Sequence, residues 1–119
     1  MNRKDLTERT KKFAHRCVKL AMTLPDTALG RHIQGQVIRC STSVAANYRA
    51  TCLSQSKPSF VAKLSIVLEE ADESAFWLEF IIDENLLPAD KVQSIKKEAY
   101  ELASIFIKSR KTAQRNDER

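Results

Sequence analysis

The sequence predicts an all-α protein, folded as an up-down-up-down four-helix bundle. Only two of its 119 residues are glycine and three are proline, while 43% are apolar and 29% are charged. Chains so poor in helix-breaking residues are usually helical, and this balance of residues is that of a folded domain. The prolines, Pro25, Pro58 and Pro88, divide the chain into four pieces of similar length. Because proline disrupts helix interiors but suits the first turn, each piece is expected to form one helix of a single domain spanning 1–119.

The first helix is predicted over residues 5–24. Asp5 and Glu8 have the spacing of a capping box, in which two side chains satisfy the free N–H groups at a helix start. Apolar residues then recur at intervals of three, four and seven, which places them on one helix face. These residues are Leu6, Phe13, Cys17, Leu20 and Leu24.

The second and third helices are predicted over residues 27–54 and 59–85. Asp26 or Thr27 can cap the second helix and Ser59 the third, since short polar side chains accept from the first free N–H groups. The apolar face of the second helix consists of Ile33, Val37, Cys40, Val44 and Tyr48. That of the third consists of Phe60, Leu64, Val67, Ala71, Leu78 and Ile82.

The third helix has further apolar residues outside this face, namely Ile66, Trp77, Phe80 and Ile81. A face that wide would expose a large apolar patch in a small monomer, and such patches usually mark an interface. We therefore expect a homo-oligomer; the alternative is a tilted helix that is buried from both sides.

The fourth helix is predicted over residues 89–112, followed by a frayed tail over 113–119. Its apolar positions are Val92, Ile95, Ala99, Leu102 and Phe106. Short connections between four long helices favour antiparallel neighbours.

The three cysteines, Cys17, Cys40 and Cys52, have no C-x-x-C spacing and are expected to be reduced and buried. No run of 18 apolar residues and no signal-peptide pattern occurs, so the sequence predicts a cytoplasmic protein with no membrane span.

Charge is distributed unevenly along the chain. The net charge of +5 divides into +5 for residues 1–24, +2 for 25–55, −5 for 56–87 and +3 for 88–119. The basic side chains of the first and fourth helices are predicted to meet at one end of the bundle and to contact phosphates without reading sequence. These predicted contacts are Arg9, Lys12, Arg16, Lys19, Lys108, Arg110 and Lys111. The alternative is that these side chains form an ordinary solvent-exposed helix face. The cations near the end of the fourth helix would then only interact favourably with the negative end of the helix dipole.

The stretch TSVAANYRA, residues 42–50, combines small side chains with one amide and one arginine. Its small residues are expected to keep the second helix thin, so that the bulky third helix, including Phe76 and Trp77, can approach closely. Asn47 lies at the edge of the apolar face, and a buried amide must find partners. The predicted partners are Glu70 or Glu73 of the third helix, with Arg49 pairing to the same acidic helix.

Catalytic and metal sites are not indicated. Glu69, Glu70 and Glu73 resemble a di-iron carboxylate cluster, but Glu-x-x-His pairs are missing, and neither His15 nor His32 has partners at ligand spacing. We expect no metal and no cofactor, and predict that these carboxylates pair with arginines of other helices. Arg9 and His15 fit a loose signature of small helical ribonucleases, which basic chains match easily. The chain has no glycine-rich phosphate loop and no nucleophile elbow.

Two segments, RCSTSVAANYRA (39–50) and FVAKLSIVLEEADESAFWLEFII (60–82), closely resemble the bacterial four-helix-bundle proteins named for the intervening sequences of 23S ribosomal RNA genes. The resemblance implies a left-handed bundle and, by likeness to retroelement accessory proteins of the same superfamily, a ring-like homopentamer. Those accessory relatives bind nucleic acid and assist a reverse transcriptase. Where relatives commonly carry C-R-A-R-S, this chain has CLSQS over 52–56, without the two arginines.

Together these observations predict a non-enzymatic, oligomeric bundle that binds RNA or DNA through a basic surface, as an accessory to an RNA- or retroelement-related process. The main alternative is a structural or adaptor protein whose apolar surface docks another protein. A small ribonuclease is the third hypothesis.

Overall fold

The computed structural model describes residues 1–117, without the side chains of 116 and 117. The described chain forms four helices and no strand, which confirms the all-α fold class. The helices are α1 (Arg3–Ala21), α2 (Ala28–Thr51), α3 (Lys57–Asp83) and α4 (Ala89–Asp117).

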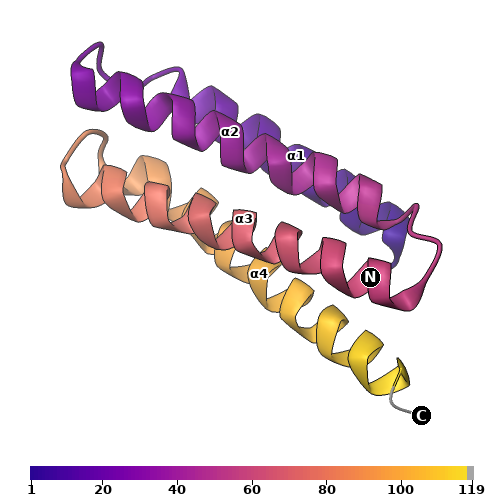
Figure 1. The fold of residues 1–119 in the computed structure, drawn as a ribbon. Coiled ribbons are helices and arrows are strands. Elements are labelled where there is room, and N and C mark those ends of the chain that lie inside the picture. Colours follow the sequence, from indigo (N-terminus) through magenta and orange to yellow (C-terminus); the bar gives the residue numbers. More distant parts are fainter. Residues whose placement is uncertain (118–119) are drawn as a thin grey trace.

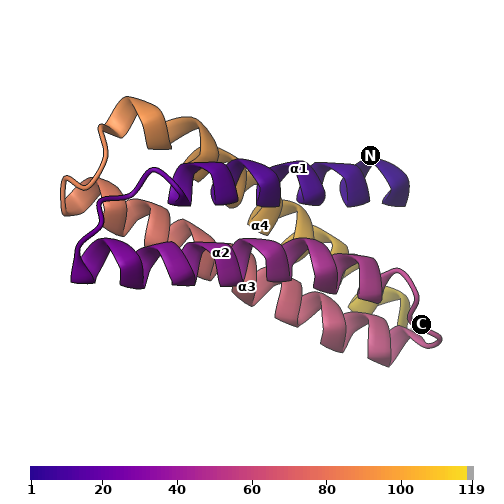
Figure 2. The same ribbon diagram turned by 90° about the horizontal axis from the view of Figure 1, so that it is seen from above.

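Successive helices run in opposite directions, so that the start of α1 and the end of α4 lie at the same end as the α2–α3 connection (Figures 1 and 2). α1 packs on α2, α2 on α3 and α3 on α4, whereas the contact between α1 and α4 is much smaller. The molecule is elongated, with extents of 51 × 21 × 19 Å. The left-handed twist of the bundle stays a prediction.

The core is built from the periodic apolar positions of all four helices. Every predicted apolar position of α2 and α4 is buried. Tyr48 of α2 stacks on Phe106 of α4, with 5.8 Å between ring centroids. Ile81, which the pattern placed outside the core, is fully buried, while Leu20 and Ile82 are only half-buried. Periodicity thus identifies the buried face well, but is less precise at its margins.

Two of the three predicted helix starts lie one turn too late. α1 is capped by Asn2, which forms a capping box with Asp5, in place of the predicted pair Asp5 and Glu8. α3 is capped by Ser56 and not by Ser59, because Pro58 occupies the first turn, where proline needs no hydrogen-bond acceptor. Thr27 caps α2, one of the two residues predicted there.

Asn85 ends α3 by adopting a left-handed backbone conformation, with φ of 55°. The N–H of Leu86 donates to the carbonyl of Ile81, and the N–H of Asn85 donates to that of Ile82. This is the Schellman arrangement, and asparagine is among the few residues besides glycine that tolerate it. At the other end of the connection α4 begins at Ala89 and runs to Asp117. The prediction of a frayed tail is therefore wrong for residues 113–117, and residues 118–119 lie outside the described chain.

The sequence predicted that small residues of α2 allow α3 to pack closely against it. In the structure, small residues of both helices lie at this contact. The Ser74 hydroxyl lies 3.2 Å from the Cys40 sulfur, and Ala71 and Ala75 are buried beside them. Phe76, predicted to pack there, is instead 50% exposed. Trp77 does reach α2, where its ring lies 5.6 Å from that of His32, so of the two aromatic residues only Phe76 is left exposed.

The two glycines of α2 give a matched prediction. A Cβ on Gly30 would lie 1.9 Å from the carbonyl oxygen of Pro25, whereas a Cβ on Gly35 would meet nothing within 4 Å. We expect Gly30→Ala to lower the free energy of unfolding by about 2 kcal/mol through overpacking. Gly35→Ala should raise it by about 0.5–1 kcal/mol, because alanine loses less conformational entropy in a helix. Urea unfolding of both variants checks this, and equal effects of the two substitutions would contradict it.

Candidate nucleic-acid interface

Arg9 of α1 is held by two carboxylates of α4. Its Nε and Nη2 donate to the two carboxylate oxygens of Glu98 at 2.8 and 2.6 Å, and Nη2 also lies 2.9 Å from Glu101. The hydrogen bond to Glu98 is the main reason that the pKa of Arg9 is raised above its ordinary value. Arg9 was predicted to contact phosphate, but its guanidinium is occupied within the bundle.

The other predicted cations of α1 lie together on its outer face. They line a shallow depression of about 470 Å³. The lining consists of Glu8, Lys11, Lys12, His15, Arg16 and Lys19. Arg16 reaches towards α4, where its Nη2 donates to the Ser94 hydroxyl at 2.8 Å. Lys11 and His15, which the predicted stripe omitted, widen the cationic face on the side of α2.

The predicted cations of α4 do not join this depression. Lys108 lines a separate cavity near the start of α1. Arg110 is half-buried and points to α3, where its Nη1 lies 3.4 Å from the Ser65 hydroxyl. Lys111 is exposed. The predicted single basic surface is therefore divided into a part on α1 and a part on α4.

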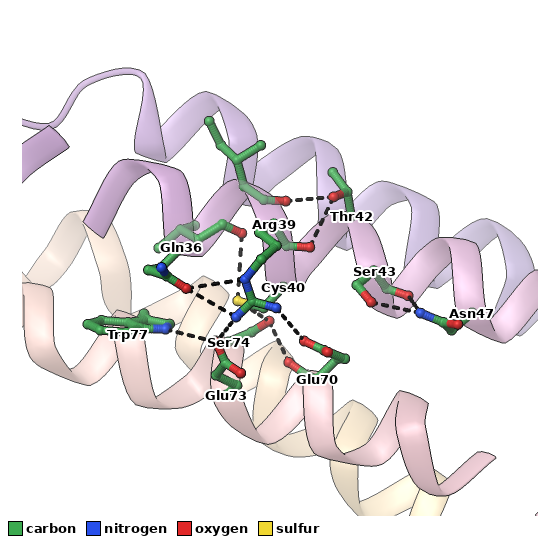
Figure 3. Close-up of polar contacts among 12 residues, drawn as sticks. Gln36, Arg39, Cys40, Thr42, Ser43, Asn47, Glu70, Glu73, Ser74 and Trp77 are labelled. Carbon is green, nitrogen blue, oxygen red and sulfur yellow. Dashed lines mark hydrogen bonds and ion pairs between the residues drawn. The ribbon is translucent and has the colours of Figure 1, made fainter. Parts of the chain in front are cut away.

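Glu70 and Glu73 of α3 pair with Arg39 of α2 (Figure 3). Nη1 of Arg39 lies 3.3 Å from Glu70, and Nη2 contacts Glu73, which also accepts from the indole N–H of Trp77 at 3.2 Å. These carboxylates thus meet an arginine of another helix, one that the sequence did not single out.

The predicted partners of Asn47 and Arg49 are wrong. Asn47 turns back to its own helix, where Nδ2 donates to the carbonyl and the hydroxyl of Ser43 at 3.0 and 2.7 Å (Figure 3). Arg49 forms no ion pair with a described side chain and lines a groove of about 550 Å³ between α1 and α2. Ala45 and Ala46 form part of the same groove opposite Lys11 and His15. These two alanines therefore face α1 and not α3.

The family model for 23S rRNA-intervening sequence proteins matches residues 3–108, which include both ion-pair clusters and the depression on α1. The chain belongs to this family. A crystal structure of a protein with unknown function from the S23 ribosomal protein family of Bacteroides thetaiotaomicron is similar over almost the whole length. It shares 30% sequence identity, with a TM-score of 0.85, and the match covers 93% of this chain and 99% of that one. No match is found among curated proteins.

In this member of the intervening-sequence protein family, the buried thiols are poorly suited to reaction. Burial is the largest cause that raises the pKa of Cys17 to about 12, and burial likewise raises the pKa of Cys40. Both therefore stay protonated at neutral pH, and the thiolate is the reactive form. Within the part of the chain that the structure describes, no three potential metal ligands cluster, and no helix is long and apolar enough to cross a membrane.

We predict that Arg9 and Glu98 stabilise the bundle jointly. Their side chains are only 25% and 15% exposed, so their charge-assisted hydrogen bonds are partly shielded from water. A double-mutant cycle with Arg9→Ala and Glu98→Gln, followed by urea unfolding, should give a coupling energy of about 1–2 kcal/mol. The pair Arg31 and Asp26, which is largely exposed, is the matched control and should couple far more weakly. Additive effects of Arg9→Ala and Glu98→Gln would contradict this role.

Proposed function

We propose that this intervening-sequence family protein is a non-enzymatic, cytoplasmic protein that binds the phosphate backbone of RNA or DNA through the outer face of α1. The observation that supports this most strongly is the depression on α1, where four cations and one histidine surround a single carboxylate, Glu8. Clustered cations on one helix face are the electrostatic signature of backbone binding.

The spacing of the cations suits an extended phosphate chain. Lys12, Arg16 and Lys19 follow one another at four and three residues, so they lie on one face of α1. At 1.5 Å per residue the row is about 10 Å long, which is the axial length of about three phosphates along one strand of duplex DNA. Contacts of this kind position a nucleic acid and do not select a sequence. Lys108 and Lys111 of α4 remain predicted as separate contacts.

A ribonuclease fits the geometry less well. Arg9 and His15 would have to act on one substrate, but they face different neighbours. Arg9 is bound to Glu98 on the side of α4, whereas His15 lines the groove on the side of α2. We therefore propose binding without cleavage.

The salt dependence of binding tests the proposal. We expect a single-stranded RNA to bind at about 50 mM salt and to dissociate as salt rises, because binding releases condensed counterions. Each single-strand phosphate contact contributes about 0.7 to the slope of log K against log salt, so Lys12→Ala with Lys19→Ala should reduce the slope by about 1.4. Fluorescence anisotropy at several salt concentrations measures the slope.

The matched control removes two lysines from other helices, Lys63 of α3 and Lys91 of α4. The slope of log K against log salt should stay close to that of the wild type in this variant. Its net charge falls by the same amount as in the α1 variant, so any difference between the two variants comes from the position of the lysines. Absence of binding by the wild type at low salt, or equal effects of the two double variants, would refute the α1 face as the binding surface.

A second candidate function, self-assembly, is favoured by the aromatic side chains of α3. Phe76 is 50% and Ile66 45% exposed, and Phe76 contacts the rings of Trp77 and Phe80. A second copy of the chain is the proposed occupant, because α3 is acidic and the groove between α1 and α2 is lined by Lys11, His15 and Arg49. The family resemblance implies a pentamer. In such an assembly Lys12 and Lys19, which do not line the groove, would stay available for phosphate.

Sedimentation velocity tests self-assembly. The wild type should sediment as a species larger than the monomer, and Phe76→Glu should shift it to the monomer by placing a charge in an apolar interface. Tyr100→Ser, which replaces an exposed aromatic residue of α4, is the control and should leave assembly unchanged. A monomeric wild type would contradict self-assembly. The exposed apolar face of α3 would then be expected to bind a different protein, as the adaptor hypothesis requires.

A further inference from the structure

The start of α1, the α2–α3 connection and the last turns of α4 lie at the same end of the bundle (Figure 2). Residues of these three segments line a further cavity. Its volume is about 620 Å³, and it shares no residue with the depression on α1. Its lining comprises Arg3, the segment 54–57, Phe60, Lys108, Ser109, Thr112 and Ala113.

Three elements supply one cation each to this cavity. Arg3 comes from the first turn of α1, Lys57 from the first turn of α3, and Lys108 from the C-terminal part of α4. None of the lining residues is acidic, and among the described residues these three cations form no ion pair. Arg3 is steadied by the Phe60 ring, whose centroid lies 5.8 Å from the guanidinium carbon. The cavity is therefore a concave, positively charged site, unlike a flat row of surface lysines.

Hydroxyl groups supply neutral donors around the same cavity. Ser109 and Thr112 contribute hydroxyls from α4, and Ser54 and Ser56 contribute them from the α2–α3 connection. The Ser54 hydroxyl is buried and has no hydrogen-bond partner among the described residues. Because this hydroxyl is shielded from solvent, the hydroxyls open to a ligand in the cavity are those of Ser56, Ser109 and Thr112.

We propose that this cavity binds a phosphate monoester, with Arg3, Lys57 and Lys108 around the phosphate and hydroxyls completing its hydrogen bonds. A phosphate monoester carries between one and a half and two negative charges at neutral pH and offers three strong acceptor oxygens. Cations supplied by three different helices suit a tetrahedral dianion, whose oxygens point in several directions, better than a planar carboxylate, which needs only one fork of donors. The N-terminal end of α3, with its positive end of the helix dipole, adds to the attraction.

The inference does not rest on binding at the α1 face. The phosphate could belong to a small metabolite or to the 5′ end of a polynucleotide, since both present the same group. Two experiments on the full chain separate the existence of the site from the source of its ligand.

The first experiment titrates inorganic phosphate into the ¹⁵N-labelled protein near pH 8 and follows amide chemical shifts. We expect saturable shifts confined to the start of α1 around Arg3 and to residues 54–60 and 108–113. Lys57→Ala with Lys108→Ala should weaken binding about tenfold or more, as the loss of charge-assisted hydrogen bonds implies. Lys91→Ala with Lys97→Ala, two exposed lysines of α4 outside the cavity, should leave binding unchanged. Both side chains replaced in the cavity are exposed, so amide spectra should show an intact fold.

Non-saturating shifts spread over all lysine-rich surfaces, or wild-type binding by the Lys57→Ala, Lys108→Ala variant, would overturn the proposal.

The second experiment compares 5′-phosphorylated with 5′-hydroxyl RNA of one sequence in the Lys12→Ala, Lys19→Ala background. A preference for the phosphorylated strand supports the site and identifies a polynucleotide end. If the two strands bind equally while inorganic phosphate still causes saturable amide shifts, the site exists and its ligand is a small phosphate compound. Failure of the α1 face would leave the first experiment unaffected.

Discussion

The ion pair between Arg9 and Glu98 is the main polar link that closes the bundle. α1 packs extensively on α2 but touches α4 over a short stretch, and there Arg9 makes three hydrogen bonds to two carboxylates. Arg9 is therefore occupied within the bundle, whereas Lys11, Lys12 and Lys19 on the neighbouring face of α1 form no ion pair with a described side chain. Towards the chain termini, away from this link, the two helices leave the cavity that Arg3 and Lys108 line.

The cations of the chain therefore fall into two groups with different roles. Arg9 and Arg39 are bound to carboxylates of neighbouring helices, and each joins two helices of the bundle. Arginine suits this role, because its planar fork of donors matches a carboxylate. Lysine carries a compact, hydrated charge on a flexible stem. It can therefore adjust to the varying positions of phosphates along a nucleic-acid backbone. Lys12 and Lys19 lie on the outer face of α1, where a flexible cation can follow such a chain.

Much of the fold could be predicted from sequence, because helix periodicity depends on local spacing. The buried face of α4, from Val92 to Phe106, follows directly from steps of three and four residues. Helix starts were less certain, since Asn2 and Ser56 compete with other capping residues nearby. The spacing of residues also predicts only on which face of its helix a side chain lies. It does not predict the side-chain conformation. It placed Asn47 correctly at the edge of the core, but not the rotation that returns its amide to Ser43.

The candidate site was harder to predict, because its geometry depends on residues far apart in the sequence. Arg9 and Glu98 are 89 positions apart, and no spacing rule connects them. The cavity formed by Arg3, Lys57 and Lys108 combines three helices and becomes recognisable only when they are packed. The uneven charge along the chain did indicate that α1 is basic and α3 acidic. It could not show which cations are neutralised inside the bundle.

Lysine acetylation footprinting tests most directly whether the outer face of α1 binds nucleic acid. Brief treatment with acetic anhydride, with and without bound RNA, followed by mass spectrometry, reports the accessibility of each lysine. We expect RNA to protect Lys12 and Lys19 together, while Lys63 and Lys91 keep their reactivity. Protection spread equally over all lysines, or centred on α3, would contradict the assignment of the α1 face as the nucleic-acid interface.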